Sequence, residues 1–194
     1  MAAREQSSAV PDAFRYFPGT VSQNHRGEIV SINCSPGGVP KLPVPEALVT
    51  TSGLFGDSQR NRRYHGGPDR AVCLFSIERI RALQDEGHPI DAGTTGENLT
   101  VAGIDWDTVV PGVHIEVGES VLEVTAFTTP CRNIRESFSD LKFSRMLHTL
   151  YPGFSRVYAR VLREGMVRVG DPTSVLRGAA RQLNSKNILI RTVP

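Results

Sequence analysis

Cysteine is scarce in this chain and widely spaced. The 194 residues contain three cysteines, Cys34, Cys73 and Cys131, and no C-x-x-C motif. An odd number of distant thiols excludes a disulfide framework, and it also excludes a four-cysteine zinc or iron–sulfur site within one chain. The sequence also lacks a G-x-G-x-x-G fingerprint and a P-loop, so we expect no internal flavin, haem or iron–sulfur cluster and no dinucleotide site.

Lysine is also rare, and arginine supplies most of the positive charge. Only Lys41, Lys142 and Lys186 are lysines, and 22 basic against 20 acidic residues give a net charge of +2. This balance does not favour a nucleic-acid partner. Arginine in place of lysine favours paired, bidentate contacts with phosphate or carboxylate groups.

Long apolar runs are absent as well. No stretch approaches the roughly 20 residues that a membrane-spanning helix needs, and residues 1–18 lack the apolar core of a signal peptide. We therefore expect a cytoplasmic protein with no membrane partner. The length fits one domain, predicted at residues 19–176, with a flexible lead-in over 1–18 and a C-terminal tail over 177–194.

Short strands dominate the pattern of the chain. Alternation predicts strands at 27–35, about 47–51 and 71–76, and a hairpin of 113–117 with 120–126, in which Gly118 at the first turn position suits a type II′ turn. A second hairpin is predicted from 154–162 and 166–169. Many short strands without a regular βαβ rhythm favour a mainly β domain, either a barrel or a sandwich with helical insertions.

Two short helices are expected between these strands. Ser76 is a suitable N-cap for a helix to about Glu86, with Ile77, Ile80 and Leu83 on one face. Residues 143–150 have apolar side chains at i, i+3, i+4 and i+7, which predicts a second amphipathic helix.

The segment 53–70, GLFGDSQRNRRYHGGPDR, has the composition of a ligand-binding loop. Its glycines allow a backbone to approach a ligand closely, and its arginines suit an anion. An ordinary charged surface loop has a similar composition, so this segment alone leaves both interpretations open.

Cys131 stands at the exit of a strand, after Pro130 and before Arg132. A neighbouring guanidinium favours the thiolate, which is the form that attacks a substrate or binds a metal, and thiolates suit soft or redox-active metals. The alternative is a buried, inert thiol.

Five motifs in a fixed order resemble those of the MOSC domain family, named after the C-terminal part of molybdenum cofactor sulfurase. They are SPGGVPKLPV (35–44), GLFGD (53–57), HGGPDRAV (65–72), GENLT (96–100) and TPCRN (129–133). The resemblance covers about Gly27 to Leu176. It is strongest to the small stand-alone bacterial type that reduces N-hydroxylated bases. It implies a strongly twisted, mixed β-barrel that binds the molybdenum cofactor, a pterin dithiolene with a terminal phosphate.

The resemblance also assigns expected roles to single residues. Cys131 would be the molybdenum ligand, His65 and Asp69 would line the metal side of the pocket, and Glu97 with Asn98 would contact the pterin or shape the wall. Other positions would let the backbone approach the cofactor or would balance the phosphate charge: Lys41, Arg62, Arg63, Gly66, Gly67, Arg70 and Arg132. The sequence departs from the family at Asn133, where relatives often have a lysine.

These assignments lead to one main hypothesis and two alternatives. The main hypothesis is an oxidoreductase that reduces the N–O bond of a small N-hydroxylated substrate, with Asp69 or His65 delivering a proton and an external reductase supplying electrons. The first alternative is a carrier or binding module for the molybdenum cofactor or for cysteine-bound sulfur, with no turnover. The second is a metal-free hydrolase with Cys131 as nucleophile and His65 as base.

Overall fold

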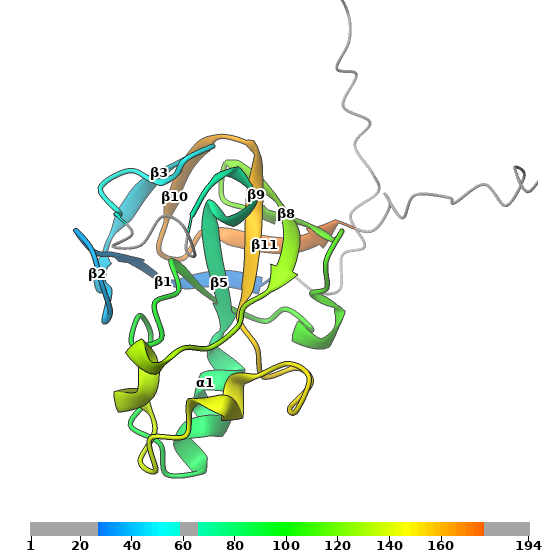
Figure 1. Ribbon diagram of the computed structural model, residues 1–194. Helices are drawn as coiled ribbons and strands as arrows, with labels where there is room; N and C mark the ends of the chain where they lie inside the picture. Colours follow the sequence, from blue (N-terminus) through cyan, green and yellow to red (C-terminus); the bar gives the residue numbers. More distant parts are fainter. Residues whose placement is uncertain (1–26, 59–65, 177–194) are drawn as a thin grey trace, which may run out of the picture.

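Seven strands close into a ring in the computed structural model, which describes residues 27–58 and 66–176 (Figure 1). The order around the ring is β11-β7-β8-β9-β5-β6-β1, and β1 returns to β11 through the pairs Gly27↔Thr173 and Glu28↔Pro172. Strand β2 extends the sheet beside β1, and β10, β3 and β4 form a separate three-stranded sheet. The strands are β1 Gly27–Cys34, β2 Leu42–Val44, β3 Glu46–Thr50, β4 Gly53–Leu54, β5 Val72–Ser76, β6 Leu99–Ala102, β7 His114–Val117, β8 Ser120–Phe127, β9 Val157–Arg163, β10 Gly165–Arg168 and β11 Pro172–Leu176.

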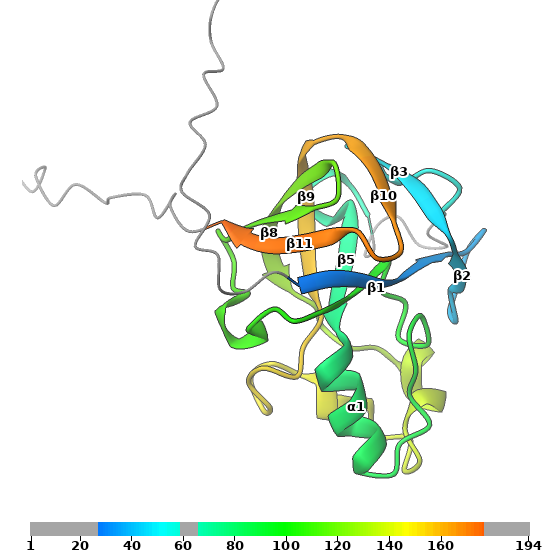
Figure 2. The same cartoon turned by 180° about the vertical axis from the view of Figure 1, so that it is seen from behind.

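The strand directions make this a mixed barrel. Strands β5 and β6 run parallel, whereas every other pair in the described sheets is antiparallel. Figure 2, seen from behind, shows β1 and β11 lying side by side where the ring closes. The predicted mainly β fold with a mixed β-barrel is thereby confirmed.

The β7–β8 hairpin forms as predicted. Gly118 has φ 53°, and Glu119 is not among the described residues with positive φ. A positive φ at the first turn position alone is the type II′ geometry. Ile115 and Val117 are fully buried, so the period-two pattern of the sequence identifies the core face of this strand.

Helix α1, Ile77–Asp85, also follows its sequence signals. The Ser76 hydroxyl accepts hydrogen bonds from the backbone N–H groups of Glu78 (3.1 Å) and Arg79 (3.3 Å), as an N-cap should. Ile77, Ile80 and Leu83 form its buried face. In Figure 1 the helix lies at the end of the barrel below β5.

The second predicted helix is shorter than expected. Residues Phe143–Met146 form a four-residue 3₁₀ helix, and the extended backbone of Leu147 ends it. His148 then stacks on Phe127, with ring centroids 3.5 Å apart and an interplanar angle of 9°. This contact with β8 takes the chain out of the helical path, and Leu150, expected on the apolar face, is 60% exposed. The other 3₁₀ helices are η1 Pro68–Arg70, η2 Trp106–Thr108 and η3 Arg132–Ser137.

The predicted hairpin of 154–162 with 166–169 is wrong. Both strands exist, but β9 pairs with β8 and β5, whereas β10 pairs with β3 from Gly165↔Val49 to Arg168↔Glu46. The connecting residue Glu164 therefore moves the chain from the barrel to the small sheet. Pattern and turn residues locate two strands in the sequence, but they do not identify the partner of each.

Several expectations fall outside the described residues. These are the lead-in 1–18, the tail 177–194 and the side chains of Arg62, Arg63 and His65. Over the described ranges, no helix has the length and apolar character needed to cross a membrane.

Candidate functional site

A cavity of about 330 Å³ lies against the β5–β9 strand pair. Cys73 and Tyr158 are directly opposite each other in this pair and line the cavity. Their neighbours Val72 and Val157 alternate with them, point to the other side and are fully buried. The lining residues are Gly38, Val39, Lys41, Ser58, Arg70, Cys73, Thr95, Gly96, Asn98, Cys131, Asn133, Ile134, Arg156 and Tyr158.

The charge of this lining has one sign. Among the described residues, the cavity wall includes Lys41, Arg70 and Arg156 and neither aspartate nor glutamate. Each cation comes from a different part of the chain: the segment before β2, helix η1 and the residue before β9. The concentration of positive charge in a concave site favours an anionic ligand.

Lys41 is fixed by a buried ion pair behind the cavity wall. Its ammonium contacts the carboxylate of Asp57, and the two side chains are only 7% and 4% exposed. The same carboxylate accepts hydrogen bonds from the Ser35 backbone N–H (2.9 Å) and the Asn98 side-chain amide (2.9 Å). Because three donors share this carboxylate, Lys41 has a defined position at the cavity edge.

Asn98 connects this pair to the barrel. Its side-chain oxygen accepts a hydrogen bond from the Cys73 backbone N–H (3.1 Å), and its amide nitrogen also donates to the Asn33 carbonyl (3.3 Å). Asn98 is 2% exposed. One side-chain amide at the cavity wall therefore joins β1, β5 and Asp57.

Glu97 lies behind the wall rather than on it. Fully buried, its carboxylate accepts hydrogen bonds from the Gly93 backbone N–H (2.6 Å) and the Thr95 hydroxyl (2.6 Å). These bonds close the turn 93–97. Gly96 has φ +84°, and a Cβ there would meet Val39 at 3.0 Å, so the turn requires glycine at this position.

Arg156 is a buried cation of the cavity, like Lys41. The two residues are 6% and 7% exposed, and the Arg156 guanidinium donates a hydrogen bond to the Thr95 carbonyl. The buried Nε has no hydrogen-bond partner. It is one of five buried side-chain atoms among the described residues without a partner, so it does not by itself indicate a ligand.

The two cysteines of the cavity differ in accessibility. Cys73 is 5% exposed, and burial raises the pKa of its thiol from 9.0 to about 11, so it stays protonated at neutral pH. Cys131 is half-buried at the cavity wall and stands at the N-cap position of η3, where its side chain makes no capping hydrogen bond. A metal ligand must be a thiolate, so Cys131 is the better ligand of the two.

Tyr158 adds a phenol to the cavity wall. Burial, followed by the neighbouring Cys73, raises the pKa of Tyr158 to about 12. The Arg70 guanidinium lies 5.7 Å from the centre of its ring. At neutral pH this side chain is therefore a neutral hydrogen-bond donor.

Alkylation should distinguish the three thiols. With iodoacetamide at pH 8, we expect Cys131 to be modified first and Cys73 last, as measured by peptide mass spectrometry over time. A pKa of about 11 leaves Cys73 with about a hundredfold less thiolate than an ordinary cysteine, before its burial slows the reaction further. The rate at Cys73 should rise up to about pH 11. Equal rates at Cys73 and Cys131 would contradict this assignment.

The remaining predicted residues have varied positions. Gly66, Gly67, Asp69 and Arg132 are outside the set that lines the cavity. The side chain of Asp69 is 70% exposed and lies 3.4 Å from that of Arg160. Arg132 lines a neighbouring surface depression that shares Asn133 with the cavity. Sequence reasoning missed Arg156 and Tyr158. Their signal was the alternation of polar and aliphatic residues from Arg156 to Val161, which was interpreted only as a strand.

Comparison with known proteins agrees with the motif series. The family model described as the MOSC domain matches residues 61–174. The chain belongs to the MOSC domain family. This family is associated with the molybdenum cofactor, and its members are often oxidoreductases.

Individual MOSC relatives extend the comparison. The uncharacterized protein YflK of Bacillus subtilis (strain 168) is 33% identical over 141 residues, covering 72% of this chain and 63% of that protein. YiiM of Escherichia coli (strain K12) is 32% identical over 153 residues, covering 71% of this chain and 67% of that protein. The crystal structure of YiiM from Geobacillus stearothermophilus has a TM-score of 0.60 and 26% identity, and the match covers 77% of this chain and 74% of that one.

This chain spans less than two thirds of the length of YflK and about two thirds of that of YiiM. The activity, substrates and partners of this MOSC protein are therefore matters for proposal.

The residues of the cavity fit the cofactor that the MOSC family implies. A half-buried thiol matches the preference of molybdenum for sulfur, and the three cationic side chains of the wall suit an anionic pterin phosphate. The cavity volume is in the range of small-molecule and cofactor sites.

Proposed function

We propose that this protein is a molybdenum-cofactor-dependent reductase of small N-hydroxylated compounds. The observation that supports this most is the juxtaposition of Cys131 with three cations on one cavity wall that has no described carboxylate, within a MOSC domain. Cys131 would ligate the metal, and Lys41 and Arg70 would balance the charge of the phosphate. When bound, the cofactor supplies two-electron redox chemistry.

The chain's own groups would position the substrate and supply protons. Reduction of an N-hydroxyl group to an amine consumes two electrons and two protons and releases water. Tyr158, which stays protonated at neutral pH, would donate a hydrogen bond to the oxygen that leaves. Asp69 is mostly exposed and pairs with Arg160, so we assign proton delivery to His65, which lies outside the described residues.

Electrons would come from a separate reductase. The sequence has three distant cysteines and no dinucleotide fingerprint, and on this basis we propose an external protein donor.

Turnover with an artificial electron donor tests the proposal. The full chain, purified with molybdenum from cells able to make the cofactor, is given an aromatic amidoxime and a reduced viologen, and amidine formation is measured. We expect turnover in wild type, at least about a hundredfold less in Cys131→Ala, and wild-type rates in Cys34→Ala, because Cys34 does not line the cavity.

Other outcomes would contradict this function. Metal-loaded protein that passes its cofactor to a second apo-enzyme without reducing any N-hydroxylated compound would establish a carrier. Ester or amide hydrolysis by metal-free protein, abolished in Cys131→Ala, would establish a hydrolase.

A further inference from the structure

We propose that the outward face of η3 forms an outer subsite for the substrate, and that this subsite selects N-hydroxylated compounds that carry a carboxylate. The face consists of Arg132, Asn133, Arg135 and Glu136, which line a surface depression of about 370 Å³. The inference rests on the proposed function and deepens it, since it names a feature of the substrate beyond the reacting N–O group.

The depression continues the cavity past Cys131. Asn133 lines both hollows, and Cys131 stands directly before η3. The cavity volume of about 330 Å³ is at the lower end of the range for small-molecule sites, roughly 300–1,000 Å³. A cofactor held in the cavity leaves the adjoining depression as the space for the part of a substrate that extends away from Cys131.

The inner side of η3 anchors it to the cavity wall. Side chains three residues apart eclipse one another in a 3₁₀ helix, and Ile134 and Ser137 form such a row, which is buried. Ile134 lines the cavity, and the Ser137 hydroxyl donates a hydrogen bond to the Thr94 carbonyl (3.1 Å). The remaining side chains of η3 are therefore directed outward from a fixed backbone.

The same spacing places two guanidinium groups in one exposed row. Arg132 and Arg135 are three residues apart, and both are exposed. Arg135 pairs with the neighbouring Glu136 carboxylate at 2.9 Å, whereas no described carboxylate pairs with Arg132. The planar fork of a guanidinium matches the two oxygens of a carboxylate. A carboxylate on the substrate would balance the uncompensated charge of this row.

Substrate selectivity tests the subsite. Molybdenum-loaded full chain with a reduced viologen is given benzamidoxime or 4-carboxybenzamidoxime, and kcat/KM is measured for each. We expect wild type to prefer the carboxylate about 2–5-fold, as for an exposed ion pair, through KM rather than kcat. Arg132→Gln should remove the preference, and Arg132→Glu should reverse it. No preference in wild type, or an unchanged preference in Arg132→Glu, would overturn the proposal.

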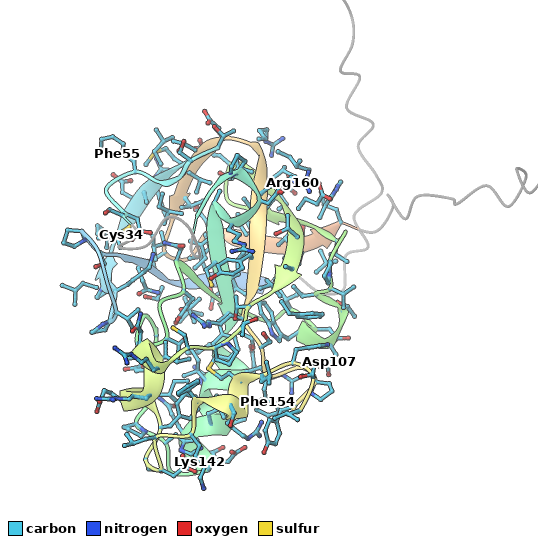
Figure 3. All side chains as sticks on the ribbon, viewed as in Figure 1. Cys34, Phe55, Asp107, Lys142, Phe154 and Arg160 are labelled. Atoms are coloured by element: carbon cyan, nitrogen blue, oxygen red, sulfur yellow. The ribbon has the colours of Figure 1, made fainter. Side chains whose placement is uncertain are left out.

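Lys142→Gln is the matched control. Lys142 has a 77% exposed side chain, precedes η4, is labelled in Figure 3 and lines neither the depression nor the cavity. Its replacement changes the net charge by the same amount as Arg132→Gln and should leave the selectivity unchanged. An equal loss of preference in the two variants would show a general effect of charge and would refute the subsite.

Molybdenum content separates a substrate subsite from a cofactor subsite. Arg132→Gln should contain as much molybdenum per chain as wild type, measured by elemental analysis. A content as low as that expected for Cys131→Ala would mean that the depression holds the phosphate of the cofactor, and this result would overturn the proposal.

Product binding keeps the two proposals distinguishable, because it requires no turnover. Calorimetry with 4-carboxybenzamidine should show affinity about 2–5-fold higher for molybdenum-loaded wild type than for Arg132→Gln. If this difference is found but neither amidoxime is reduced, the proposed function fails and the subsite stands. If both amidoximes are reduced equally well and the product affinities are the same, the subsite fails and the proposed function stands.

Discussion

Replacement of Cys131 by alanine is expected to empty this protein of molybdenum. Cys131 is the more accessible of the two thiols on the cavity wall, and burial keeps Cys73 protonated. Loss of the proposed thiolate ligand should lower the molybdenum content per chain to less than about a tenth of wild type. The measurement is elemental analysis of full chain from cells able to make the cofactor.

Cys34→Ala provides the matched control. Cys34 has a similar intermediate exposure, but it does not line the cavity (it is labelled in Figure 3 on the side of the barrel near β2). Burial and then Asp57 raise its pKa, which disfavours the thiolate. Molybdenum retained in Cys131→Ala but lost in Cys34→Ala or Cys73→Ala would refute the ligand assignment.

The second large effect concerns stability. Asp57→Ala should lower the free energy of unfolding by about 3–5 kcal/mol, because it leaves the buried Lys41 ammonium without its counter-ion. It also removes the acceptor of the Ser35 N–H and the Asn98 amide. Urea denaturation followed by circular dichroism measures the change.

The double variant Lys41→Met with Asp57→Ala should recover much of this loss, since no buried charge is left unpaired. An exposed pair provides the comparison. The side chains of Lys142 and Asp140 are 3.4 Å apart and are 77% and 45% exposed. Lys142 lies at the end of the molecule where α1 is found (Figure 3). Lys142→Ala should change stability by less than about 1 kcal/mol. Similar effects of Asp57→Ala and Lys142→Ala would contradict the importance of burial.

The fold was predictable where local signals decided it. Ser76 and the spacing of Ile77, Ile80 and Leu83 located α1, and Gly118 located the turn of the β7–β8 hairpin. The pairing partner of a strand was not predictable where two strands that follow each other in sequence could pair either with each other or with other strands. Strand β9 ends at Arg163, and Gly165 begins β10, which pairs with β3 across more than a hundred residues, a contact that no local pattern encodes.

The candidate site was predictable in part for a related reason. Cys131, Lys41, Arg70 and Asn98 stand in loops or beside glycines and prolines, where polar residues suggest function, and all four line the cavity. Arg156, Tyr158 and Arg160 alternate with aliphatic residues, and they are buried, half-buried and exposed, respectively. In sequence such residues resemble a solvated face. Only the tertiary structure shows that loops cover one end of it.

The parallel alignment of β5 and β6 has a consequence for how this protein family can vary. Antiparallel neighbours can be joined by two residues, but strands that point the same way need a crossover, here residues 77–98. The last residues of this crossover, just before β6, include Thr95, Gly96 and Asn98, which line the cavity. An insertion around Gly87, after α1, would leave the hydrogen bonds of the barrel unchanged. Changes in the residues just before β6 would alter the shape of the cavity.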